Sequence, residues 1–189
     1  MFNKHLILIL MVVAVLSHTA FAEMTLDGGN STISFVSVKK SIAGEVHTFN
    51  SISGSLSDAG DLRITIDLNS VDTNIEIRDQ RMKELLFETL KFPKAVLTAQ
   101  LGESDTAGEI KKINAEATLD LHGMKNTIMV EAVAAWVGDQ LLVTSLKPVI
   151  INVADFKLVA GVEKLREIAS LPSIATAVPV SFVLVFNSG

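Results

Sequence analysis

Alternation of apolar and polar residues dominates the chain and predicts β-strands. In residues 61–69, leucine or isoleucine occupies every second position and polar residues fall between them. This is the period of a strand with one buried face. Runs of strand character cover residues 32–39, 42–49, 52–57, 61–69, 94–102, 109–121, 126–137, 140–153 and 178–186. The pattern therefore predicts eight or nine strands.

Short turns between these runs predict antiparallel pairing. His122-Gly123 separates two runs, and Gly138-Asp139 separates the next two, as expected for successive hairpins. An antiparallel set of this size avoids exposed edges by closing into a barrel. A barrel of about eight strands is wide enough to hold one small ligand. We therefore expect an all-β fold, an antiparallel β-barrel.

Two stretches depart from the strand pattern and predict short amphipathic helices. From Thr73, the sequence Thr-Asn-Ile-Glu fits a capping box in which Glu76 reaches back to the cap residue. Apolar residues then recur at helical spacing until Pro93 stops the segment. Residues 162–171 carry the second helical stripe and end before Pro172. Both helices are expected to lie over the barrel.

Residues 1–22 have the organisation of a secretory signal peptide. Lys4 precedes an apolar run over residues 6–16, and Ala20-Phe21-Ala22 supplies the small residues of a cleavage site. The apolar run is too short to span a bilayer with margin. We expect the mature chain to be a single domain, residues 23–189, in the periplasm and without stable membrane insertion. The sequence leaves open whether it forms a homodimer.

Composition argues against several function classes. The chain has 16 lysines and arginines against 21 acidic residues, and removal of Lys4 with the signal peptide leaves a net charge of −6. This charge argues against nucleic acid as a partner. The absence of cysteine excludes disulfides, thiolate metal sites and a cysteine nucleophile. One Trp and no Tyr argue against an outer-membrane barrel, which carries aromatic girdles.

Residues able to carry catalysis are few. The chain has no Gly-x-Ser-x-Gly elbow, no His-Glu-x-x-His pair and no phosphate-binding glycine loop. His47 and His122 have no second ligand or base at a recognisable spacing, so we interpret both as structural. Arg78 and Asp79 are interpreted as pinning their helix to the barrel. We expect no enzyme, metal or cofactor; catalysis would require Arg78, Asp79 and His122 to converge in one cleft.

The segment from Ser70 to Pro93 carries Ser-Val-Asp-Thr at 70–73, Arg78-Asp79, Leu86-Phe87 and Phe92-Pro93. In these features it resembles the hallmark segment of the YceI-like family of exported lipid-binding proteins. The ATLDLHG stretch at 117–123 and Asp155-Phe156 are also similar to that family. The resemblance covers residues 25–186. It implies an extended lipocalin-like barrel of about eight strands with two short amphipathic helices.

The resemblance also implies an apolar ligand and no catalytic residues. The ligand would be a polyisoprenoid or isoprenoid-quinone chain, sequestered, transported or stored in the barrel. Residues 158–177 form a longer segment than the family's usual loop, so they would either cap the cavity or fill it. A filled barrel would instead be a stress-related or partner-binding exported protein without a lipid ligand. The expected lining residues are Phe35, Ile64, Ile66, Met82, Leu85, Leu86, Phe87, Leu97, Leu119, Ile128, Trp136, Phe156 and Phe182.

Overall fold

The computed structural model of the chain describes residues 23–102 and 110–188. The predicted signal peptide, residues 1–22, lies outside the described residues. The strands are β1 (Glu23–Leu26), β2 (Thr32–Lys39), β3 (Ala43–Phe49), β4 (Ile52–Ser57), β5 (Asp61–Asp67), β6 (Val71–Asp72), β7 (Lys94–Gln100), β8 (Ile110–Leu121), β9 (Met124–Val137), β10 (Gln140–Ser145), β11 (Val149–Asn152) and β12 (Ala177–Asn187). The helices are α1 (Glu76–Arg81) and α3 (Val159–Ile168), with single turns η1 (Leu68–Ser70), η2 (Met82–Leu86) and η3 (Val153–Phe156).

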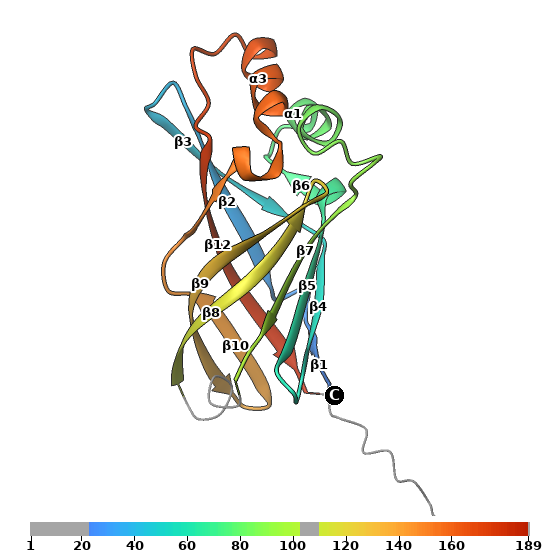
Figure 1. The fold of residues 1–189 in the computed structure, drawn as a ribbon, viewed down its shortest axis with the longest axis vertical. Coiled ribbons are helices and arrows are strands. Elements are labelled where there is room, and N and C mark those ends of the chain that lie inside the picture. The colour runs from blue at the N-terminus through green and yellow to red at the C-terminus, as the bar shows by residue number, and fades with distance from the viewer. Residues whose placement is uncertain (1–22, 103–109, 189) are drawn as a thin grey trace, which may run out of the picture.

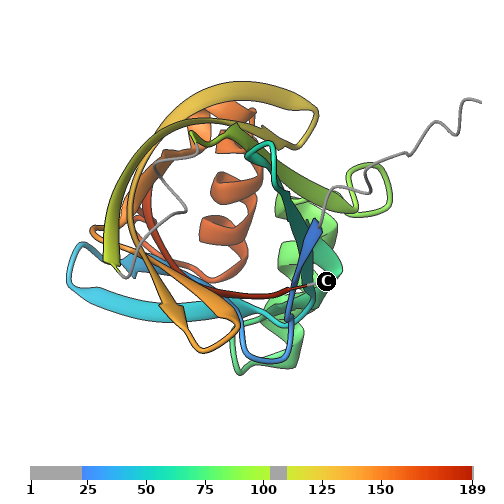
Figure 2. The ribbon, with the colours of Figure 1, turned by 90° about the horizontal axis from the view of Figure 1, so that it is seen from below.

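The strands form a closed antiparallel barrel, as the sequence predicts. Within the described residues, eight strands make the ring β1-β4-β5-β7-β8-β9-β10-β12, and pairing of β12 with β1 closes it. The β2–β3 hairpin pairs with β12 and extends toward the end of the barrel that carries both helices (Figure 1). Viewed along the barrel, α3 lies across the ring of strands (Figure 2). The all-β prediction is confirmed.

Both predicted hairpin turns are present. Leu121 pairs with Met124 across the first turn, where His122 and Gly123 have φ values of 53° and 73°. Two consecutive positive φ angles match the right-handed twist of the flanking strands. At the second turn Val137 pairs with Gln140, and Gly138 has a φ of 64°. These turns fix β8, β9 and β10 as consecutive neighbours in the barrel.

Several strand boundaries differ from the prediction. The strand β1 is not among the runs that the alternating pattern predicts, although it closes the ring through β12 and β4. The predicted strand over residues 140–153 divides into β10 and β11 around Pro148, which has no N–H to donate to a sheet. The predicted strand over 61–69 ends at Asp67, whose side chain accepts a hydrogen bond from the backbone N–H of Asn69 and begins the turn η1.

The predicted capping box at Thr73 is wrong. Helix α1 begins at Glu76 with Ile75 as its N-cap residue, and Ile75 makes no side-chain capping bond. The Asp79 carboxylate instead accepts hydrogen bonds from both the backbone N–H and the hydroxyl of Thr73, at 2.8 and 2.5 Å. Asp79 therefore ties the helix to the preceding strand, as its predicted pinning role requires. The helix then continues as the π-turn η2.

Helix α3 runs from Val159 to Ile168, three residues earlier than predicted at each end. Gly161 allows it to approach η2 closely. A Cβ atom at this position would lie 2.7 Å from the carbonyl oxygen of Leu85 and 2.8 Å from the Cα of Leu86. Any larger residue would force the helix away from η2. The two helical segments thus form one layer over the end of the barrel.

Candidate ligand-binding cavity

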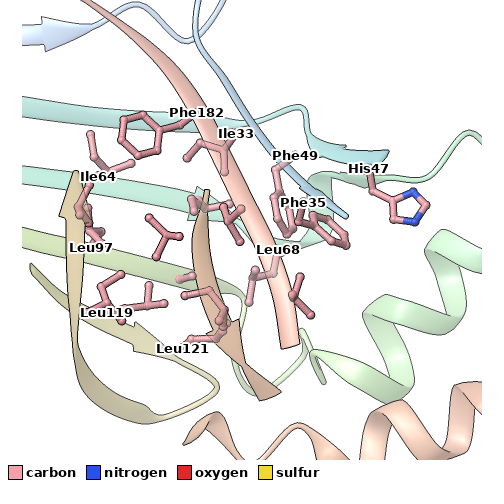
Figure 3. Close-up of a pocket in the computed structure, with 18 of the residues that line it drawn as sticks. Ile33, Phe35, His47, Phe49, Ile64, Leu68, Leu97, Leu119, Leu121 and Phe182 are labelled. Carbon is pink, nitrogen blue, oxygen red and sulfur yellow. The ribbon is translucent and has the colours of Figure 1, made fainter. Parts of the chain in front are cut away.

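The barrel encloses a cavity of about 440 Å³. Pockets that bind small molecules usually measure roughly 300–1,000 Å³. The inward-facing residues of the strands line the cavity, and α1, η2 and α3 cover its helical end (Figure 3). Alternation along β8 shows how the sequence builds this wall: Ile113, Ala115 and Ala117 are buried while the residues between them are exposed.

Most of the predicted lining residues lie on the cavity wall. They come from the strands β2, β5, β7, β8, β9 and β12 and from the segment that follows α1. The predicted residues on the wall are Phe35, Ile64, Ile66, Met82, Leu86, Phe87, Leu97, Leu119, Ile128 and Phe182. Their contact with a ligand stays a prediction.

Three predicted residues lie elsewhere. Phe156 is only 1% exposed but packs in η3, within the apolar cluster beneath the helices. Trp136 lies next to the turn at the end of β9 and is 39% exposed. Leu85 lies in η2 beside Gly161 and is not part of the wall. The alternating pattern indicates which face of a strand points inward, but it does not say how far along the strand the cavity extends.

Small residues on the wall were missing from the prediction. Ala95, Ala99, Ala115, Ala117 and Ala132 all line the cavity. Their signal was present in the sequence, since these alanines occupy inward positions of alternating strands. Aromatic and branched residues are predicted as lining because they supply apolar surface, whereas alanines contribute to the cavity by leaving space.

The segment 158–177 caps the cavity and leaves it open inside. Leu158, Val162 and Leu165 line its helical end. The chain after α3 is held against the end of β2, because the N–H of Lys40 donates to the carbonyl of Ser173 and the N–H of Ala175 donates to that of Val38. The alternative of a filled barrel does not describe this structure.

Polar side chains are confined to one end of the cavity. Among the described residues, five polar side chains line the cavity, and all the remaining residues on the wall are apolar. The polar lining residues are Ser37 and Lys39 of β2, His47 of β3, and Arg78 and Arg81 of α1. Figure 3 shows His47 beside the helices, away from Ile64 and Phe182. The cavity is thus an apolar chamber with a polar end.

A carboxylate links the β2–β3 hairpin to α1 at this polar end. Glu45 Oε2 lies 2.6 Å from Lys39 Nζ and also accepts a hydrogen bond from Arg78. The second Arg78 terminal nitrogen donates to the backbone carbonyl of Thr73. The hydrogen bond from Lys39, together with Arg78, lowers the pKa of Glu45 below its ordinary value. Glu45 is therefore ionised at neutral pH and holds both cations in place.

His47 is an uncharged member of the polar end. Its side chain is buried, with Nε2 lying 2.8 Å from the hydroxyl of Ser37 and its ring 5.2 Å from that of Phe35. Burial lowers the pKa of His47, and the nearby charge of Arg78 lowers it further. The imidazole is consequently neutral at pH 7.

The lowered pKa of His47 predicts that the protein loses stability in mild acid. The unfolded chain binds a proton at His47 near its ordinary pKa of 6.5, whereas the folded chain binds it only at lower pH. The free energy of unfolding should therefore be highest above pH 6.5 and fall as the pH drops through that value. Denaturant unfolding at pH 7.5 and 5.5 measures this. His47→Gln should show a smaller decrease, and an equal decrease in the variant would contradict the assignment.

The residues considered for catalysis belong to two separate clusters. Arg78 and Asp79 bond to Glu45 and Thr73, as described above. His122 Nε2 instead lies 3.1 Å from a carboxylate oxygen of Glu88, and its ring lies 4.4 Å from that of Phe92. Among the residues that the structure describes, no group of three His, Asp or Glu side chains is placed to hold a metal ion.

Sequence comparison identifies the class of protein that this fold represents. The profile of the YceI-like domain matches residues 24–186. The chain therefore belongs to the YceI-like family, as its hallmark segment predicts. No curated protein sequence matches it. Within residues 23–102 and 110–188, no helix is long and apolar enough to cross a membrane.

Solved structures show the same fold. A polyisoprenoid-binding domain from Saccharophagus degradans, implicated in plant cell wall breakdown, is 38% identical with a TM-score of 0.85 over 89% of this chain and 99% of that chain. Burkholderia cenocepacia BcnA is 20% identical with a TM-score of 0.70, over 85% and 98%. The Campylobacter jejuni YCEI protein is 18% identical with a TM-score of 0.54, over 76% and 84%. The last two support the fold alone.

Proposed function

We propose that the protein binds a polyisoprenoid or isoprenoid-quinone chain in its barrel and acts as a periplasmic carrier or store, without catalysis. The observation that supports this most directly is the cavity of about 440 Å³, which is lined mainly by apolar side chains and covered at one end by helices. Similarity to the Saccharophagus degradans polyisoprenoid-binding domain supports the same ligand class.

The physical chemistry of the wall suits such a ligand. An isoprenoid chain has almost no hydrogen-bonding groups, so it needs apolar surface and little else. Covering about 600 Å² of ligand surface would contribute about 15 kcal/mol at roughly 25 cal/mol per Å². Association and ordering remove about half of this or more. Binding in the micromolar range or tighter is then expected without any reactive group.

Recovery of the ligand tests the proposal. Protein purified from its own periplasm should give, by native mass spectrometry, a mass increment that organic extraction releases as a lipid. Delipidated protein should then take up quinones and polyprenols in a titration. Repeated isolation of ligand-free protein, combined with no uptake of either class, would contradict the proposed function.

A further inference from the structure

We propose that the polar end of the cavity is a head-group subsite in which Arg81 selects an apolar chain that ends in an acidic group. This inference rests on the proposed function, and it adds the chemical class of the ligand's head. It concerns the end formed by β2, β3 and α1, where all the polar lining residues of the described chain are gathered.

The asymmetry of the wall sets the orientation of the ligand. A wholly apolar ligand that filled the cavity would press hydrocarbon against Ser37, Lys39 and Arg81. Covering polar groups without replacing their hydrogen bonds costs free energy. An amphiphile with its chain among the barrel residues and its head beside α1 avoids this cost. The ligand therefore enters the barrel tail first.

Positively charged side chains outnumber negatively charged ones at this end of the cavity. Lys39 and Arg78 are both paired with Glu45, and the carboxylate of Asp79 is held by Thr73. His47 is neutral, since burial lowers its pKa. Across the described residues, Arg81 has no carboxylate within ion-pair distance, although it lies on the cavity wall and is partly buried. Three cations therefore face two carboxylates, and one negative charge would balance them.

Helix α1 positions Arg81 for this role. Residues 78 and 81 are three apart, so their side chains lie on the same face of α1. Arg78 is fixed by Glu45 and the carbonyl of Thr73, which leaves the guanidinium of Arg81 to donate to a ligand. A guanidinium offers two parallel N–H groups to the paired oxygens of a carboxylate or phosphate. A carboxylate and a phosphate each fit the subsite, since each presents paired oxygens with negative charge.

Ligand pairs that differ only in the head group test the inference. Farnesyl phosphate is compared with farnesol, and palmitate with hexadecanol, by titration of the delipidated protein below the micellar concentrations. We expect the wild-type protein to bind each acidic ligand about tenfold more tightly than its alcohol, as one charge-assisted contact provides. Arg81→Gln should reduce the preference for the acidic ligand to between about onefold and threefold, while the affinity for the alcohol is retained. Arg63→Gln, which removes an exposed arginine outside the cavity, should leave the ratio unchanged.

The outcomes separate this inference from the proposed function. A gain for both acidic ligands indicates selection by charge, and a gain for farnesyl phosphate alone indicates selection of phosphate; either supports the subsite. Equal affinity for acid and alcohol in the wild type, or a ratio that Arg81→Gln leaves unchanged, would overturn the inference while chain binding stands. Failure of all four ligands to bind a protein that still takes up polyprenols would also overturn the inference, and failure of the polyprenols as well would overturn the proposed function.

Discussion

Ala117→Phe is expected to abolish binding of an apolar chain without unfolding the protein. Ala117 is 2% exposed and lines the cavity from the middle of β8, paired with Ala99 of β7 and Ile128 of β9. A benzyl group at this position projects into the space that the ligand's chain would occupy. Displacing four methylene groups from the cavity removes about 3 kcal/mol at ~0.8 kcal/mol each. The affinity should fall by a factor of about 100 or more.

Thr118→Phe provides the matched control. Thr118 is the next residue on β8 and faces solvent, because alternate residues of a strand point to opposite faces. The control adds the same ring to the same strand outside the barrel, so it should bind as the wild type does.

Displacement titration measures affinity and thermal unfolding confirms that both variants fold. Wild-type affinity in a folded Ala117→Phe protein would show that the ligand binds outside the barrel. Should the phenyl group prevent folding, Ala117→Leu fills less of the cavity and should still weaken binding.

The alternating pattern predicted the barrel because each strand carries its own signal. The inward and outward faces of β5 and β8 can be read from neighbouring residues. Closure of the ring was less visible, since it depends on β1, which has only four residues and pairs with strands far away in the sequence. The start of α1 was misplaced for a similar reason. Thr73 and Glu76 have the spacing of a capping box, but the side chain of Asp79 bonds to Thr73 instead.

The site was predictable in its apolar part and less so in its polar part. Inward positions of strands such as Ile64 and Leu97 follow directly from the pattern. The polar end instead requires Glu45 to meet Arg78 across 33 positions of sequence, and no local pattern encodes that pairing. The pinning role predicted for Arg78 agrees with its bonds to Glu45 and Thr73. For the neighbouring Arg81, only the packing of α1 over the cavity distinguishes it from other surface arginines.

Phe156→Ala is expected to give the largest loss of stability among the residues that the sequence assigns to the cavity. Phe156 is 1% exposed and packs in the cluster beneath the helices, where Leu158 and Val162 are also buried. Truncating a buried Phe leaves a cavity and typically costs about 3–5 kcal/mol. A native domain is stabilised by only about 5–15 kcal/mol in total. Denaturant unfolding should therefore show a large shift of the midpoint, while the affinity of the remaining folded protein changes little.

Phe182→Ala should affect ligand binding more than stability, the reverse of Phe156→Ala. Phe182 is partly buried and faces the cavity, so truncating its ring removes surface that a ligand would contact. Without ligand the ring has fewer partners to lose, and the expected destabilisation is smaller than for Phe156→Ala. Binding should weaken more in Phe182→Ala than in Phe156→Ala. A Phe156→Ala protein with strongly reduced affinity and unchanged stability would contradict this assignment. Phe156 would then contact the ligand directly, and the binding cavity would extend beneath α3.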